Sequence, residues 1–182
     1  MPTLPNFLPY YSNVLKKIRD LRCEPWLTEG AIHFLTQFLS ESPKDVLEFG
    51  SGASTLWLSS RAGTLVSIEH NPDFYEKLLP MLPNTDYRLC PRPHNVVCKT
   101  FHDAAFDFIL VDGCDRNKIM KEAPRLLRPG GVLMLDNAER YWYTKVFPLF
   151  ATWNQTISIQ NQKDSHGFHL IGWQTRWWIK PN

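Results

Sequence analysis

The sequence predicts an α/β protein with a doubly wound, mostly parallel seven-stranded sheet that ends in a C-terminal antiparallel hairpin. Short apolar runs, typical of strands buried on both faces, alternate with segments whose apolar residues recur at helical spacing. Near the C-terminus, two stretches alternate polar and apolar residues, the pattern of strands covered on one face. Alternating strands and helices favour parallel pairing, and the two final stretches favour a hairpin.

The N-terminal part is predicted to form a helical cap before the first strand. Ser12 is a candidate N-cap of one helix, and Thr28 of a second helix with apolar residues on one face. We expect residues 1–182 to form a single domain, with residues 1–44 as its N-terminal helical segment.

Three strands and two helices are predicted over residues 45–90. The strands are Asp45–Phe49, Leu65–Glu69 and Tyr87–Cys90, and the first helix covers Ser54–Arg61. Asn71 and Pro72 mark the start of the second helix, because asparagine caps helices and proline suits the first helical position.

The second half continues the alternation. Phe106–Val111 and Val132–Leu135 read as buried strands around a helix through Ile119–Leu127, which Pro124 is expected to bend or interrupt. Residues 91–100 show no period and are predicted to be a loop. An aromatic-rich helix from about Glu139 toward Trp153 then leads to the hairpin strands Thr156–Gln160 and Ile171–Ile179.

The composition argues against several classes of partner. The net charge of +2 comes from interspersed signs, so no nucleic acid partner is expected. No apolar stretch is long enough to span a bilayer, and the N-terminus lacks a signal-peptide pattern. The four cysteines are scattered without a paired zinc or disulfide spacing. These features predict a cytoplasmic protein without a membrane partner.

The first predicted strand leads into a glycine turn with an acidic residue before it. Glu48 lies near the end of the strand, and Gly50, Ser51, Gly52 and Ser54 lead into the next helix. Glycines let the backbone approach a ligand, and the free N–H groups of a helix start receive a carboxylate. Glu69 ends the second strand about 20 residues later, where a carboxylate accepts hydrogen bonds from ribose hydroxyls. This pairing suits a cofactor that contains a nucleoside.

Two details disfavour a nicotinamide dinucleotide in this turn. A dinucleotide fingerprint has a third Gly or Ala where this chain has the larger Thr55. Glu48 would add negative charge near a pyrophosphate, whereas it suits a sulfonium or an ammonium group.

The segments Glu48–Gly52 and Ser67–His70 resemble the first motif and the acidic second strand of class I S-adenosylmethionine-dependent methyltransferases. The resemblance covers roughly residues 45–137 and the terminal hairpin. It implies that the glycine turn holds the methionine part of the cofactor and that Glu69 holds the ribose. The expected cofactor-binding residues are Glu48, Gly50, Ser51, Gly52, Ser54, Glu69, His70 and Asp112. A structural role is the alternative for His70, and the usual polar adenine contact is not evident in residues 89–92.

Three oxygen-bearing residues end the fourth and fifth predicted strands. Asp112, Asp136 and Asn137 are expected to share one crevice, because ligands of such sheets gather at the carboxyl ends of the strands. They are the candidate catalytic residues, and they resemble the metal triad of catechol-type O-methyltransferases, which implies Mg²⁺ or another divalent cation. The alternatives are that they cap helices, that Asp112 pairs with Arg116, or that Asp112 is a metal-free general base.

Together these residues predict a methyltransferase that acts on a small molecule, with oxygen as the favoured acceptor atom. The aromatic residues Tyr10, Tyr11, Trp26, Tyr141, Trp142 and Tyr143 favour an aromatic or apolar acceptor. The alternatives are a nicotinamide-dependent oxidoreductase and a non-catalytic cofactor-binding module. The sequence leaves the oligomeric state open.

Overall fold

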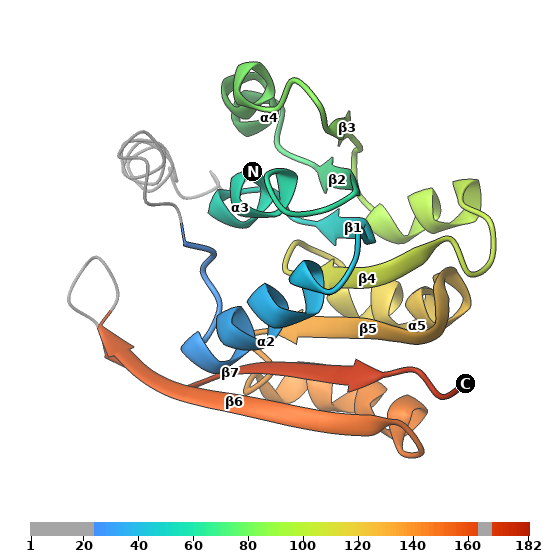
Figure 1. Cartoon of the computed structure of the whole chain (residues 1–182). Coiled ribbons are helices and arrows are strands. Elements are labelled where there is room, and N and C mark those ends of the chain that lie inside the picture. Colours follow the sequence, from blue (N-terminus) through green and yellow to red (C-terminus); the bar gives the residue numbers. More distant parts are fainter. Residues whose placement is uncertain (1–23, 164–168) are drawn as a thin grey trace, which may run out of the picture.

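One sheet of seven strands runs through the protein in the order β3-β2-β1-β4-β5-β7-β6 (Figure 1). The structure, a computed structural model of the whole chain, describes residues 24–163 and 169–182. The strands are β1 (Asp45–Phe49), β2 (Thr64–Glu69), β3 (Asp86–Leu89), β4 (Phe106–Val111), β5 (Leu127–Asp136), β6 (Asn154–Lys163) and β7 (His169–Ile179). Strands β1 to β5 pair in parallel, and β7 runs antiparallel to both β5 and β6. The predicted fold class is therefore confirmed, with β6 and β7 as the C-terminal hairpin.

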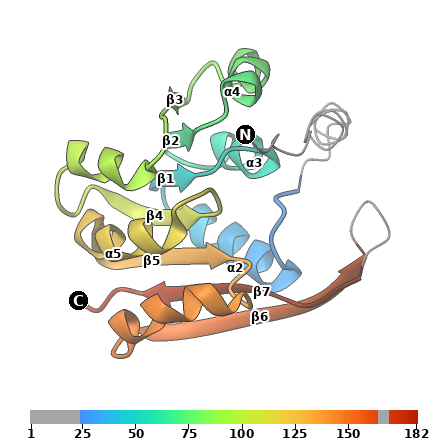
Figure 2. The same cartoon turned by 180° about the vertical axis from the view of Figure 1, so that it is seen from behind.

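Helices cover both faces of the sheet (Figures 1 and 2). The α-helices are α2 (Glu29–Ser40), α3 (Ala53–Ser59), α4 (Pro72–Leu78) and α5 (Arg116–Leu126), and the 3₁₀ segments are η1 (Leu79–Met81), η2 (His94–Thr100) and η3 (Tyr141–Phe150). Helices α2 and α3 pack on one face, and η2, α5 and η3 pack on the other. Helix α4 packs against β3 and α3 in a smaller apolar cluster.

The two faces follow from alternation along the central strands. In β4, Phe108 and Leu110 join the core beneath α2 and α3, while Ile109 and Val111 join the core beneath α5. All four side chains are fully buried. A strand buried on both sides needs apolar residues at every position, and this need explains the continuous run in the sequence.

The carboxyl ends of β1 and β4 meet at the point where the strand order reverses. Asp112 N–H donates to the Phe49 carbonyl at 2.9 Å, and Gly50 N–H donates to the Ile68 carbonyl at 2.9 Å. A Cβ atom added to Gly50 would lie 2.5 Å from the backbone of Gly113, so the two turns touch backbone to backbone. Such a reversal point is where open α/β sheets bind their ligands.

Three predicted elements differ from the structure. Residues 91–100 contain η2 and are not only a loop; η2 places Val97 and Cys98 in the core. Helix α5 continues past Pro124 to Leu126, so the proline does not interrupt it. The aromatic segment that was expected to be a longer helix forms the 3₁₀ segment η3.

The predicted helix starts have different outcomes. Asn71 caps α4, since its side chain accepts a hydrogen bond from Phe74 N–H at 3.1 Å. Thr28 precedes α2 but its side chain makes no capping hydrogen bond; its own N–H donates to Thr175 Oγ1. The helix predicted after Ser12 lies outside the described residues.

None of the described helices is long and apolar enough to cross a membrane.

Candidate functional site

The turn after β1 places open backbone at the centre of the sheet's carboxyl edge. Gly50 has a φ of +94°, which favours glycine, and Gly113 leaves no space for a side chain there. Gly52 differs, because a Cβ atom added to it would meet nothing within 4 Å. The turn is therefore packed against the loop after β4 on one side and open at Gly52.

Glu69, at the end of β2, points back at this turn. Its Oε2 accepts hydrogen bonds from Ser51 N–H at 3.1 Å and from Ser51 Oγ at 2.7 Å. Its Oε1 accepts from the N–H groups of His70 and Asn71, both at 2.8 Å. Burial alone would raise the pKa of Glu69, but these hydrogen bonds together with the His70 side chain hold it below its usual value. The site thus contains a buried, ionised carboxylate beside the glycine turn.

Hydroxyl groups already surround this carboxylate. Ser51 Oγ, which bonds to Glu69, lies 2.7 Å from the phenol oxygen of Tyr87. Tyr87 was not predicted as a site residue, because its position on the short strand β3 carries no motif. The structure adds it to the group formed by Ser51, Glu69 and His70.

Glu48 is fully buried and lies behind the turn. Its carboxylate accepts hydrogen bonds from the hydroxyls of Ser54, Thr55 and Ser67 at 2.5–2.6 Å. Burial raises the pKa of Glu48 to about 7, although these three hydrogen bonds oppose the rise. Thr55 Oγ1 also accepts from Gly52 N–H at 2.8 Å, so Glu48 and Thr55 together support the backbone of the turn. Ser67 was not among the predicted site residues, although a serine inside an otherwise apolar strand was the available signal.

Two of the three strand-end residues predicted for a metal meet on an arginine. Asp112 Oδ1 lies 2.9 Å from Arg116 Nη2, and Asn137 Oδ1 accepts from Arg116 Nη1 at 3.3 Å. The same guanidinium donates to the carbonyl oxygens of Asp112, Gly113 and Asp136. Arg116 is only 7% exposed, so a buried positive charge lies between the fourth and fifth strand ends.

Asp136 directs its side chain elsewhere. Its carboxylate accepts hydrogen bonds from Trp173 Nε1 at 3.1 Å and from Thr175 Oγ1 at 2.7 Å, both on β7. Burial raises the pKa of Asp136, and the nearby charge of Asp112 raises it further. Thr175 also accepts from Thr28 N–H, so this carboxylate connects β5, β7 and the start of α2.

In this arrangement the three residues do not fit a divalent cation. A magnesium site needs converging, unpaired oxygen ligands. Here Asp112 and Asn137 face a guanidinium, and Asp136 faces an indole and a hydroxyl. The Arg116 pairing, one of the alternatives stated above, is the arrangement found.

Part of the predicted aromatic wall lies next to this arginine. Tyr143 places its ring 5.5 Å from the Arg116 guanidinium, and Trp142 lies edge-on against Tyr143 with centroids 5.9 Å apart. Tyr141 and Trp142 are 77% and 43% exposed. Trp26 is exposed in the segment before α2, while Tyr10 and Tyr11 lie outside the described residues.

Solved structures share this fold at low sequence identity. An O-methyltransferase from Bacillus cereus in complex with SAH has a TM-score of 0.66 and 17% identity, over 99% of this chain and 93% of that chain. The chain has the class I methyltransferase fold. A 1,6-didemethyltoxoflavin-N1-methyltransferase from Burkholderia thailandensis has a TM-score of 0.60 and 16% identity, over 100% of this chain and 93% of that chain. A putative caffeoyl-CoA O-methyltransferase from Staphylococcus aureus has a TM-score of 0.64 and 16% identity, over 92% of this chain and 91% of that chain.

Sequence comparisons add nothing to the fold assignment. No protein-family model matches the chain, and no curated protein matches it. The methyltransferase fold therefore rests on the structure, and it agrees with the resemblance seen in the strand-end motifs.

Proposed function

We propose that the chain binds S-adenosylmethionine and transfers its methyl group to a small-molecule acceptor, with oxygen as the acceptor atom. The observation that carries the proposal is the contact between Glu69 and Ser51, which joins the acidic end of β2 to the glycine turn of β1. This contact occurs in a fold shared with an SAH-bound O-methyltransferase.

The donor side is formed by residues of the first two strand ends. Glu69 binds the ribose, since its lowered pKa keeps a carboxylate that accepts hydrogen bonds from hydroxyl groups, as it now does from Ser51. The open backbone at Gly52 provides the close approach for the methionine part. Glu48 supports the turn from behind through Ser54 and Thr55. S-Adenosylmethionine supplies an electrophilic methyl group on its sulfonium sulfur.

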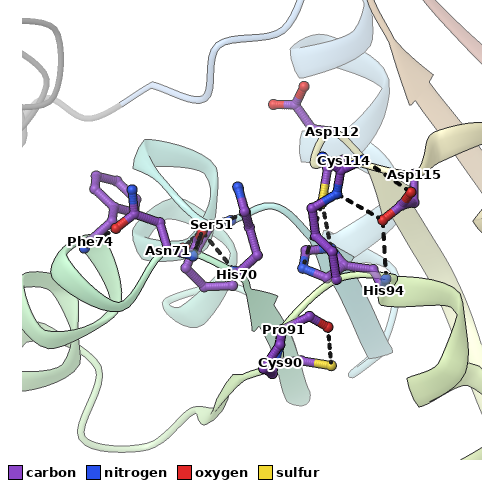
Figure 3. Close-up of polar contacts among 12 residues, drawn as sticks. Ser51, His70, Asn71, Phe74, Cys90, Pro91, His94, Asp112, Cys114 and Asp115 are labelled. Atoms are coloured by element: carbon purple, nitrogen blue, oxygen red, sulfur yellow. Dashed lines mark hydrogen bonds and ion pairs between the residues drawn. The ribbon is translucent and has the colours of Figure 1, made fainter. Parts of the chain in front are cut away.

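The acceptor side centres on Asp112. Its side chain is 26% exposed at the end of β4, and Figure 3 shows its carboxylate directed away from the other labelled side chains. Burial raises the pKa of Asp112, while Arg116 and Arg140 oppose the rise. Asp112 accepts the proton of the acceptor hydroxyl as the oxygen bonds to the methyl carbon and the methyl–sulfur bond breaks, which leaves S-adenosylhomocysteine. Arg116 holds Asp112 in place. No metal takes part in this step.

The exposed rings of Tyr141 and Trp142 favour an aromatic or apolar acceptor.

The three cysteines in the described part of the chain are free thiols, which supports a cytoplasmic location.

Calorimetry and thermal denaturation test the donor assignment. S-Adenosylhomocysteine should bind and raise the melting temperature, whereas NAD should do neither. Tight binding of NAD without binding of S-adenosylhomocysteine would favour the oxidoreductase alternative. Binding without turnover, in a screen of hydroxylated aromatic acceptors with methyl-labelled cofactor, would favour the non-catalytic module.

A further inference from the structure

Two histidines and a cysteine form a cluster beside the proposed donor site. His70 follows β2, His94 begins η2, and Cys114 follows β4 (Figure 3). Their ligand atoms, one from each side chain, all lie within 4.8 Å of one another. Cys114 Sγ lies 3.5 Å from His94 Nδ1, and the two imidazole rings are in edge contact with centroids 5.4 Å apart.

The spacing is close to that of a tetrahedral zinc site. Zn–S and Zn–N bonds of about 2.3 and 2.0–2.1 Å place neighbouring ligand atoms roughly 3.4–3.6 Å apart. The contact between Cys114 and His94 has this length. Because the His70 side chain is 37% exposed, its imidazole has room to rotate toward the other two ligand atoms, which lie within 4.8 Å of it.

His70 also has the outer contact that is typical of a metal-ligating histidine. His70 Nδ1 lies 2.9 Å from Glu69 Oε1, so Nε2 is the nitrogen left to bind a cation. His94 is fully buried, and its backbone N–H donates to Asp115 Oδ2 at 3.3 Å, which holds the start of η2 in place. A carboxylate or a backbone carbonyl behind the imidazole fixes its tautomer and orientation.

The charges nearby suit a cation. Glu69 and Asp115 bring two carboxylates to the edge of the cluster, and Arg92 pairs with Asp115 at 3.2 Å while its own side chain is 60% exposed. The fixed positive charge is thus at the surface, and the carboxylate of Glu69 is buried beside the histidines.

We propose that His70, His94 and Cys114 bind a thiophilic divalent cation of the zinc class, with an exchangeable fourth ligand. The soft thiolate and two imidazoles select such a cation over magnesium. Binding forms a metal–sulfur bond and releases the Cys114 thiol proton to solvent. This site is separate from the Asp112, Asp136 and Asn137 group, and it does not depend on methyl transfer.

Cobalt substitution tests the site in the reduced, metal-free full chain without methyl donor. One equivalent of Co²⁺ should give intense visible bands of four-coordinate cobalt and a thiolate-to-cobalt band in the near ultraviolet, and Zn²⁺ should remove both. Cys114→Ser should lose the thiolate band, and His70→Asn should weaken cobalt binding at least tenfold. Cys90→Ser is the matched control, because Cys90 is a half-buried thiol outside the cluster and should keep the full spectrum.

A second measurement uses the unmodified chain, so it does not depend on how the variants fold. Saturating Zn²⁺ should slow alkylation of Cys114 at least tenfold while leaving Cys90 unchanged, as read by peptide mass spectrometry. The proposal is overturned if Co²⁺ gives no thiolate band, if Cys114→Ser keeps it, or if Zn²⁺ leaves Cys114 as reactive as before.

Discussion

Arg116 Nη2 lies 2.9 Å from Asp112 Oδ1, and both groups lie at the end of β4 where the acceptor is expected. The arginine also binds three backbone carbonyls and Asn137, so it joins the ends of β4 and β5 through one buried charge. The charge that stabilises this edge of the sheet is therefore supplied by the chain itself.

Removing that charge should destabilise the fold strongly. Arg116→Met leaves the carboxylate of Asp112 and several carbonyls without their donor, and breaking a buried pair costs about 3–5 kcal/mol. Arg128→Met is the matched control, since Arg128 also binds two carboxylates but is 38% exposed, and its loss should cost about 0–1 kcal/mol. Urea denaturation measures both; equal losses would show that burial of Arg116 does not matter.

Methyl transfer should proceed without magnesium. Because Arg116 occupies the position between Asp112 and Asn137, added Mg²⁺ or Mn²⁺ should leave the rate unchanged. Asp112→Asn should slow transfer by about 10²–10⁴-fold at saturating cofactor, the range for loss of a general base. The wild-type rate should rise with pH as Asp112 ionises, and the variant should lose that rise. A rate that depends on Mg²⁺ would restore the metal hypothesis.

Glu69 should contribute directly to cofactor affinity. Glu69→Ala should weaken binding of S-adenosylhomocysteine by about 1.5–3 kcal/mol, the range for lost hydrogen bonds to a charged group. Glu69→Gln keeps the shape of the side chain but not its charge, so its affinity should lie between those of the wild type and Glu69→Ala. Asp73→Ala removes a nearby exposed carboxylate from α4 and should leave the affinity unchanged. Calorimetry that gives one affinity for all four proteins would remove Glu69 from the site.

Glu48 should make the protein less stable as pH rises. Its pKa is about 7 in the folded state and 4.5 ordinarily, so between these values the folded chain holds a proton that the unfolded chain has released. The free energy of unfolding should therefore fall by about 3 kcal/mol from pH 4.5 to above pH 7 through this group. Glu48→Gln keeps the hydrogen-bonding shape and removes the titration. The difference in stability between wild type and variant, measured by urea at several pH values, should follow this fall; parallel profiles would contradict it.

The elements that the sequence predicted well are those in which local pattern and tertiary environment agree. Asp45–Phe49 and Phe106–Val111 match β1 and β4 at both ends, because strands covered on both faces are mostly apolar, and only Asp45, Glu48 and Asp107 interrupt these two runs. Segment η2 was missed because one of its three buried residues is polar: His94, Val97 and Cys98 are at helical spacing, but a histidine does not count as apolar in a search for hydrophobic periodicity.

At the site, the sequence predicted which strand ends carry the acidic residues, but it did not predict where their side chains point. Asp136 and Asn137 are neighbours, yet one binds β7 and the other binds Arg116. Asn137 has a φ of +51°, a backbone turn that no pattern in the sequence indicates. Hydrogen-bond partners from distant segments, such as Thr175 for Asp136, depend on how the elements pack, and a local sequence motif does not indicate them.

The backbone contact between Gly50 and Gly113 links the turn after β1 to the turn after β4. A side chain at Gly50 would collide with Gly113, and a side chain at Gly113 would meet Gly50 N at 2.9 Å. Neither Gly50 nor Gly113 can therefore gain a side chain unless the other turn moves. Under the proposed function, added bulk at Gly113 would also move the turn proposed to hold the methyl donor, whereas the exposed side chains of Tyr141 and Trp142 in η3 can be changed without touching that contact.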